Sequence, residues 1–181
     1  MRDIAAELDM AVGNLYYYFR DKQELLAFVQ DDALAALLEL AERVISLREP
    51  AEERLFALIV GHVVLINEST PGSVAHLEVE ALGERLRPAV QRRRDTYERR
   101  VRDLLEEGIA SGRFRPVDAG MTARLMLGSL NWTARWFRPG GGQSAAEVGR
   151  AAADLLLAGV LAPGIPTPPA PAQTPASRSG R

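Results

Sequence analysis

The side chains best suited to chemistry lie close to the start of the chain, in the run VGNLYYYFRDK at residues 12–22. Tyrosine hydroxyls and a lysine ammonium group can donate hydrogen bonds to phosphate oxygens, and an asparagine amide can pair with the edge of an adenine. Gly13 has no side chain, so a helix that carries it can approach a sugar-phosphate backbone closely, and Val12 can meet a thymine methyl group. The run therefore predicts contacts with DNA through Val12, Gly13, Asn14, Tyr16, Tyr17 and Lys22.

Two short helices would position these residues. Apolar residues at positions 4, 5 and 8 predict one face of a first helix, which ends at residues 9 and 10. A second helix can begin near Ala11 and turn Leu15 and Phe19 inward. Two short helices joined by a tight turn form a helix-turn-helix. The tyrosines could instead wedge this unit against the next helix, and we expect Tyr18 to do so.

The same stretch resembles the DNA-binding segment of TetR-family transcriptional repressors. The resemblance lies in Ile4-Ala5, Gly13-Asn14-Leu15-Tyr16, Tyr18-Phe19 and Lys22-Gln23-Glu24-Leu25-Leu26. Asp9 replaces the family's turn glycine, and aspartate adopts left-handed geometry more readily than most residues. Ala11 replaces the serine N-cap of the recognition helix, which should weaken that helix start by roughly 0.5–2 kcal/mol.

The resemblance also implies a first helix and a basic arm ahead of the helix-turn-helix. The chain starts at Met1, and Met1-Arg2-Asp3-Ile4 resembles the family's Thr-Val-Arg-Asp-Ile with methionine replacing valine. We therefore expect either a misassigned start or a true truncation that removes the first helix.

The composition constrains function in several ways. The 181 residues are 47% hydrophobic, enough for a core, and carry a formal net charge of −2. Residues 1–30 hold more acidic than basic side chains, which is the reverse of the usual pattern in DNA-binding proteins. Cysteine is absent, which excludes disulfides and thiol chemistry. No apolar run is long enough for a membrane span and no signal-like segment is present, so we expect a cytoplasmic protein.

The rest of the chain has helical periodicity throughout, so the predicted fold class is all-α, with eight helices. Helices are expected at about 22–47, 50–69, 73–86, 88–110, 119–137 and 145–161, and Asp21, Asp118 and Ser144 are the expected N-caps of the first, fifth and sixth of these. The second is expected to be central and buried because it is apolar nearly all round. The predicted organisation is a helix-turn-helix at 1–21, a connecting helix at 22–47, a ligand-binding and dimerisation domain at 48–162 and a disordered Pro/Ala-rich tail at 163–181.

Polar and aromatic residues among apolar helices predict a small-molecule pocket in the body. The candidates are His62, Asn67, His76, Asn131, Trp132, Arg135 and Trp136. Each histidine could instead be a satisfied core or surface residue. Two distant histidines without a matching carboxylate predict no metal, and no other cofactor is expected. The segment 132–141 resembles TetR-type regulators of lipid and steroid catabolism in actinobacteria, which implies a hydrophobic effector, with acyl-coenzyme A thioesters as candidates.

Small residues beside leucines on the final two helices predict a homodimer held by a four-helix bundle. The predicted interface residues are Leu127, Ala134, Val148, Ala152, Leu155, Leu156 and Gly159. The alternative is that this face packs within one chain. A dimer would bring two recognition helices to successive major grooves, roughly 34–36 Å apart.

Eight arginines lie between residues 85 and 102. The simpler interpretation is a solvated helix face with ion pairs Asp95–Arg99 and Glu98–Arg102. The alternative is a site for a ligand's phosphates.

The resemblance and these residues together predict a homodimeric repressor that a hydrophobic small molecule releases from double-stranded operator DNA, with no membrane partner. The alternative is a ligand-binding homodimer that has lost autonomous DNA binding. An enzyme with His62 or His76 as general base is disfavoured, since no partner carboxylate or nucleophile motif stands at a suitable spacing.

Overall fold

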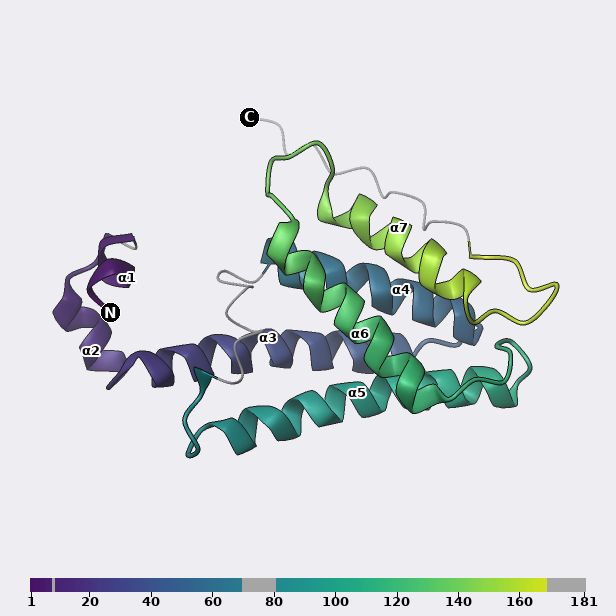
Figure 1. Ribbon diagram of the computed structural model, residues 1–181, viewed down its shortest axis with the longest axis horizontal. Helices are drawn as coiled ribbons and strands as arrows, with labels where there is room; N and C mark the ends of the chain where they lie inside the picture. Colours follow the sequence, from purple (N-terminus) through teal and green to yellow (C-terminus); the bar gives the residue numbers. More distant parts are fainter. Residues whose placement is uncertain (8, 70–80, 169–181) are drawn as a thin grey trace.

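The computed structural model describes residues 1–7, 9–69 and 81–168, and these residues form an all-α fold, as the sequence predicts (Figure 1). The helices are α1 (Arg2–Glu7), α2 (Val12–Tyr18), α3 (Lys22–Ile45), α4 (Ala51–Val64), the π-helix η1 (Leu65–Ser69), α5 (Arg87–Ala110), α6 (Ala119–Trp136) and α7 (Ala145–Ala158). An isolated bridge between Phe114 and Leu161 is the one β-type pairing in this part of the chain.

The long helix α3 connects two parts of the molecule. Figure 1 shows α1 and α2 at its N-terminal end, away from the remaining helices, while its C-terminal part runs beside α5. We call residues 1–21 the head and the bundle of α4 to α7 with the C-terminal part of α3 the body. In the body, α7 packs along α4, and α6 contacts both α5 and α4.

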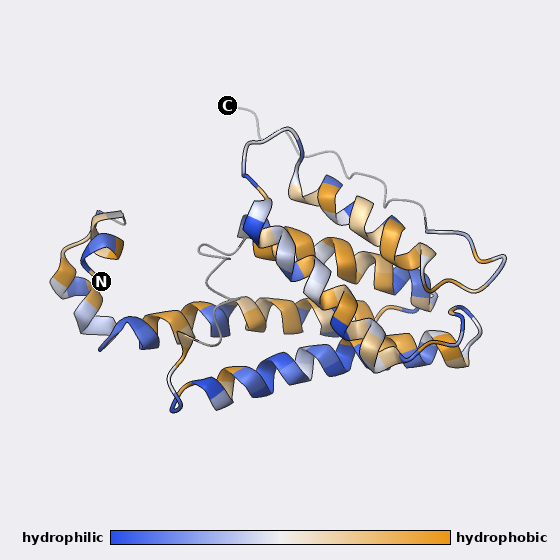
Figure 2. Cartoon of the chain, in the orientation of Figure 1, coloured by the Kyte–Doolittle hydropathy of each residue, from blue (hydrophilic) through white to orange (hydrophobic). Residues whose placement is uncertain are grey.

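Helix α4 forms the centre of the body, as its apolar sequence predicts. Leu55, Ile59 and Val63 are fully buried, and α4 contacts α3, α5, α6 and α7. Figure 2 shows α4 as largely hydrophobic, whereas the first half of α5 is largely hydrophilic. After Val64 the helix continues as η1, so the predicted helix at 50–69 is present but changes its winding near its end.

Helix starts follow the capping residues read from the sequence. Asp21 accepts hydrogen bonds from the backbone N–H groups of Gln23 and Glu24, and Asp118 accepts one from Met121. Ser144 and Glu147 form a complete capping box at the start of α7.

The predicted helix at 73–86 is not confirmed where it can be checked. Residues 73–80 lie outside the described part of the chain; Ala81 has 3₁₀-helical geometry, Leu82 lies in a bend, and residues 84–86 form a turn before α5. The backbone groups there bind side chains in place of helical partners. The Arg87 guanidinium donates to the carbonyl of Leu82, and the Gly83 N–H donates to Gln23. Of the predicted tail, residues 163–168 contain no helix and 169–181 are outside the described residues.

The arginines of α5 make ion pairs, but with other partners than predicted. Neither Asp95–Arg99 nor Glu98–Arg102 occurs among the ion pairs of the described residues. Instead Arg93 pairs with Asp31 and Arg100 with Glu42, both on α3, because α3 presents carboxylates alongside α5. Within the ranges described, no helix is both long and apolar enough to cross a membrane.

Candidate functional site

The turn between α1 and α2 depends on a residue in left-handed geometry. Asp9 has a φ of 50°. It occupies the turn position at which the TetR family usually has glycine. The N–H of Met10 donates to the carbonyl of Ala5 at 2.8 Å, which closes the first helix. This geometry confirms the prediction that Asp9 can make the turn.

Helix α2 has one buried residue and a broad exposed face. Leu15 is buried towards the rest of the head, while the N-cap Ala11 makes no side-chain hydrogen bond, as predicted. The residues predicted to contact DNA lie together on and just after this helix: Gly13, Asn14, Tyr16, Tyr17 and Lys22 are exposed and Val12 is half-buried. Tyr17 is 83% exposed and Tyr16 53%, so both hydroxyls are accessible from outside.

The prediction that Tyr18 packs inward is wrong. Its side chain is 70% exposed and lies edge-on to Tyr17, with ring centroids 5.0 Å apart. The aromatic contact with α3 is made by Phe19, whose ring centroid lies 5.3 Å from that of Phe28. Helix α2 ends at Tyr18, and the extended backbone of Phe19 allows its wholly apolar ring to make this contact.

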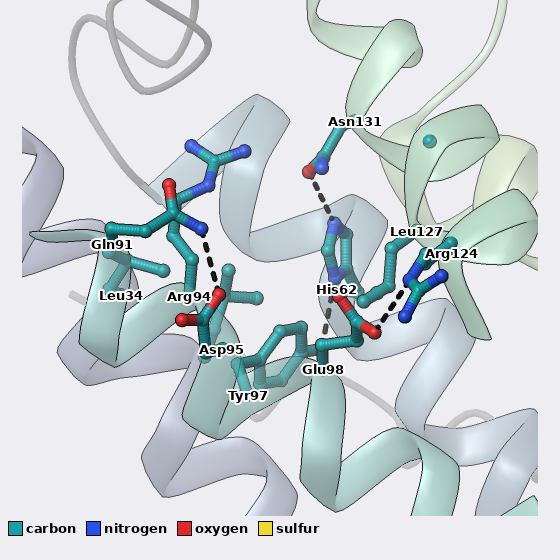
Figure 3. Close-up of a pocket in the computed structure, with 12 residues that line it drawn as sticks. Leu34, His62, Gln91, Arg94, Asp95, Tyr97, Glu98, Arg124, Leu127 and Asn131 are labelled. Carbon is teal, nitrogen blue, oxygen red and sulfur yellow. Dashed lines mark hydrogen bonds and ion pairs between the residues drawn. The ribbon is translucent and has the colours of Figure 1, made fainter. Parts of the chain in front are cut away.

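A cavity of about 250 Å3 lies in the body where α3, α4, α5 and α6 meet (Figure 3). Leu34 and Leu37 of α3 and Leu127 of α6 supply apolar lining. The remaining lining residues are His62 of α4, Gln91, Arg94, Asp95, Tyr97 and Glu98 of α5, and Arg124, Gly128 and Asn131 of α6.

Three polar residues from three helices are linked on one wall of the cavity. His62 is almost fully buried, and its Nδ1 lies 2.9 Å from the hydroxyl of Tyr97. Its Nε2 lies 3.2 Å from Oδ1 of Asn131. Figure 3 shows the histidine ring between the two partners. Burial raises the pKa of Tyr97 well above its ordinary value, so the phenol keeps its proton.

Charged side chains on α5 and α6 line the rest of the cavity. The Nε of Arg124 donates to Glu98 at 3.1 Å, and the amide of Gln91 donates to Asp95 at 2.8 Å. Arg94 is half-buried, and this burial lowers the pKa of its guanidinium, an effect that the Asp95 carboxylate opposes. Arginine nevertheless remains charged in proteins, so the lining contains both cations and anions.

The structure brings together only part of the predicted ligand-binding set. His62 and Asn131 line the cavity. Asn67 is buried elsewhere and donates to the Val63 carbonyl and to the Thr133 hydroxyl, both at 2.8 Å, while His76 lies outside the described residues. Trp132, Arg135 and Trp136 are exposed and do not line the cavity.

Helix geometry explains why Trp132 lies outside the cavity. Successive residues on an α-helix point about 100° apart, so a helix that turns Asn131 into the cavity turns Trp132 away from it. The sequence analysis did not assign Arg94, Gln91 or Tyr97 to the pocket. Tyr97 carried a usable signal, because a tyrosine in a buried apolar stripe needs a partner for its hydroxyl.

The predicted interface residues are also divided. Ala134 and Val148 are buried in the core of their own chain, and Leu127, Ala152 and Leu156 are half-buried against it. Gly159 is exposed, and Leu155 is 75% exposed. Large apolar residues are also exposed on α6, at Met121, Leu125, Trp132 and Trp136. The described residues contain no cluster of metal-ligating side chains.

A helix-turn-helix with an exposed second helix, joined to a helical body with a cavity, defines a helical DNA-binding regulator. Residues 48–160 match the family model of the tetracyclin repressor-like C-terminal domain, and residues 1–29 match that of bacterial regulatory proteins of the tetR family. The chain therefore belongs to the TetR family. It is a transcriptional regulator rather than an enzyme.

Individual relatives agree with this assignment. The HTH-type transcriptional repressor KstR2 of Mycolicibacterium smegmatis is 27% identical over 163 residues, which cover 88% of this chain and 80% of KstR2. The TetR family transcriptional regulator PfmR of Thermus thermophilus is 33% identical with a TM-score of 0.78, over 87% of this chain and 86% of PfmR. AibR in complex with isovaleryl coenzyme A and operator DNA shares the fold, at 24% identity and a TM-score of 0.70, over 88% of this chain and 85% of AibR.

Proposed function

We propose that this protein is a homodimeric repressor that leaves its operator when a hydrophobic small molecule occupies the body. The single observation that carries the proposal is the outer face of α2, where Asn14, Tyr16 and Tyr17 are exposed beside Gly13 while Leu15 is buried. Tyr16, Tyr17 and Lys22 would contact phosphates, and Val12 and Asn14 would contact base edges.

An exposed apolar face supports the dimer. Met121, Leu125, Trp132 and Trp136 follow one another at helical spacing along α6, and Leu155 projects from α7. Exposed large apolar residues at this spacing favour an interaction site. A second copy that packs α6 and α7 against this face would complete a four-helix bundle and fix the separation of the two heads. The interface would then use Trp132, Trp136 and Leu155 rather than the buried Ala134 and Val148.

The cavity supports an effector that is small and largely apolar. Leucines from α3 and α6 would contact its hydrocarbon part, and Arg94 and Arg124 would stand near any acidic group. The acyl thioester bound by AibR makes acyl-coenzyme A compounds one candidate class. Such a ligand would release DNA only if it binds one arrangement of the body more tightly than the other.

The test compares two adjacent exposed tyrosines. Tyr17→Phe removes a hydroxyl from a proposed phosphate contact, and a hydrogen bond to a charged group contributes roughly 1.5–3 kcal/mol. We expect at least about tenfold weaker binding to a duplex selected from a random-sequence pool, and a similar loss for unselected DNA, since phosphates carry no sequence information. Tyr18→Phe is the matched control. Gel-shift titration at constant salt measures the DNA affinity of each variant. Equal affinity of wild type and Tyr17→Phe would show that the Tyr17 hydroxyl does not contact a phosphate.

A second function is favoured by the charge of the head. Residues 1–30 carry Arg2, Arg20 and Lys22 against Asp3, Glu7, Asp9, Asp21 and Glu24. This balance favours a ligand-binding homodimer without autonomous DNA binding. The same titration separates the two functions, because that protein would select no duplex from the pool and would still bind its effector.

A further inference from the structure

The hydrogen-bond chain on the cavity wall has a defined direction. Oδ1 of Asn131 can only accept a hydrogen bond, so Nε2 of His62 must carry the proton that joins them. Because burial disfavours the charged form, the imidazole of His62 is taken as neutral with one N–H, so Nδ1 is the acceptor and the Tyr97 hydroxyl donates to it. The direction therefore runs from Tyr97 through His62 to Asn131, and each member is held by a different helix.

This direction determines what Asn131 offers to a ligand. Its oxygen accepts from His62, so the amide oxygen faces the imidazole and the amide nitrogen, with its two N–H donors, faces away from it. Among the described residues, this nitrogen has no hydrogen-bond partner, and Asn131 is half-buried on the cavity lining. The amide of Asn131 is therefore a neutral donor on a cavity lining that also includes Leu127 and Leu37.

We propose that the amide N–H of Asn131 donates to a carbonyl oxygen of the effector, with His62 and Tyr97 as positioning residues that fix the amide orientation. The inference rests on the proposed function of the cavity as the effector site. It assigns the effector to small apolar carbonyl compounds, that is, ketones, esters or thioesters. The volume of about 250 Å3 is just below the usual range of roughly 300–1,000 Å3 for ligand pockets, which favours short hydrocarbon parts over bulky ring systems.

The experiment uses two probes of nearly equal shape, methyl pentyl ketone and heptane, which differ in the carbonyl group. Ligand-observed NMR titration of the full chain gives an affinity for each. We expect the wild-type protein to prefer the ketone roughly three- to tenfold, the range expected of one neutral hydrogen bond. Asn131→Leu keeps the volume and removes the amide, so the preference should disappear through loss of ketone affinity alone.

Tyr97→Phe tests the positioning role, because it removes a hydroxyl that is bonded to His62 and leaves the Asn131 amide itself unchanged. Loss of the hydroxyl frees His62 to carry its proton on Nδ1, so the orientation of Asn131 is no longer imposed. The ketone preference should fall while heptane affinity stays constant, a split that general damage to the cavity would not produce. Ser129→Ala, a polar-to-apolar change on α6 outside the cavity lining, is the control and should keep the wild-type preference.

The outcomes separate this inference from the proposed function. If both probes bind with equal affinity in all four proteins, the cavity takes apolar ligands but Asn131 recognises no carbonyl. If neither probe binds the wild-type protein, the cavity is not the effector site, and this inference fails together with the effector part of the proposed function. A variant that prefers the ketone as strongly as wild type despite lacking the Asn131 amide overturns the assignment of that residue.

Discussion

The backbone N–H of Gly83 donates to the side-chain oxygen of Gln23 at 3.0 Å, joining the turns before α5 to the first turn of α3. Arg85 pairs with Glu24 one residue further on, at 2.9 Å. The pKa of Glu24 is lowered by the backbone N–H of Arg20 and next by the Arg85 side chain. Beside these contacts Leu82 is buried against Leu34, which also lines the cavity. The junction of head and body is therefore adjacent to the proposed effector site.

Leu82 should anchor this junction. Leu82→Ala removes a side chain that is 1% exposed, and such truncations cost roughly 2–5 kcal/mol when the cavity they leave does not collapse. Urea denaturation should show that the free energy of unfolding falls by an amount in that range. Leu47→Ala, a truncation at an exposed leucine, should cost under about 0.5 kcal/mol. Comparable losses in the two variants would show that Leu82 does not pack tightly between α3 and α5.

The dimer proposal depends on the exposed face of α6 and α7. Leu155→Arg places a charge on the proposed seam, where a second copy would bury it without a partner. Sedimentation velocity should then detect monomer at concentrations where the wild type is dimeric. Leu47→Arg adds the same charge at another exposed leucine and should leave the assembly unchanged. A folded Leu155→Arg dimer would locate the interface on another surface.

Local rules predicted much of the fold from the sequence. Helical periodicity and the caps at Asp21, Asp118 and Ser144 identified the starts of α3, α6 and α7, because these signals depend on neighbours within one turn. The left-handed turn at Asp9 was also predictable, since few residue types adopt that geometry. These features need no knowledge of how the helices pack.

The site was harder to predict because it depends on which face of each helix turns inward. Helix α6 carries apolar or aromatic residues on both faces, so periodicity alone could not separate Asn131, in the cavity, from Trp132, outside it. The partnership of His62 with Tyr97 joins residues 35 positions apart and arises from the packing of α4 against α5. Such long-range pairs leave no local pattern in a single sequence.

Gly149 should be required for the close packing of α7 on α4. A Cβ at this position would lie 3.0 Å from the Cα of Val60 and 3.1 Å from its carbonyl oxygen, both backbone atoms. Gly149→Ala should therefore lower the free energy of unfolding by roughly 1–3 kcal/mol, the usual cost of overpacking. Gly128→Ala meets no atom within 4 Å and should raise it by about 0.5–1 kcal/mol, because alanine favours the helix. Denaturation without effector measures both, and stabilisation by Gly149→Ala would mean that α7 can shift away from α4.

The capping box of α7 should make stability depend on acid pH. The backbone N–H of Ser144 and then its hydroxyl lower the pKa of Glu147 from the ordinary 4.5. A lowered pKa in the folded state means that the contribution is present above about pH 4.5 and is lost as the pH falls through the folded-state value. The melting temperatures of wild type and Glu147→Gln should therefore differ most near neutral pH and converge in acid. A difference that stays constant from neutral pH to about pH 3 would show that the Glu147 charge does not contribute to the cap.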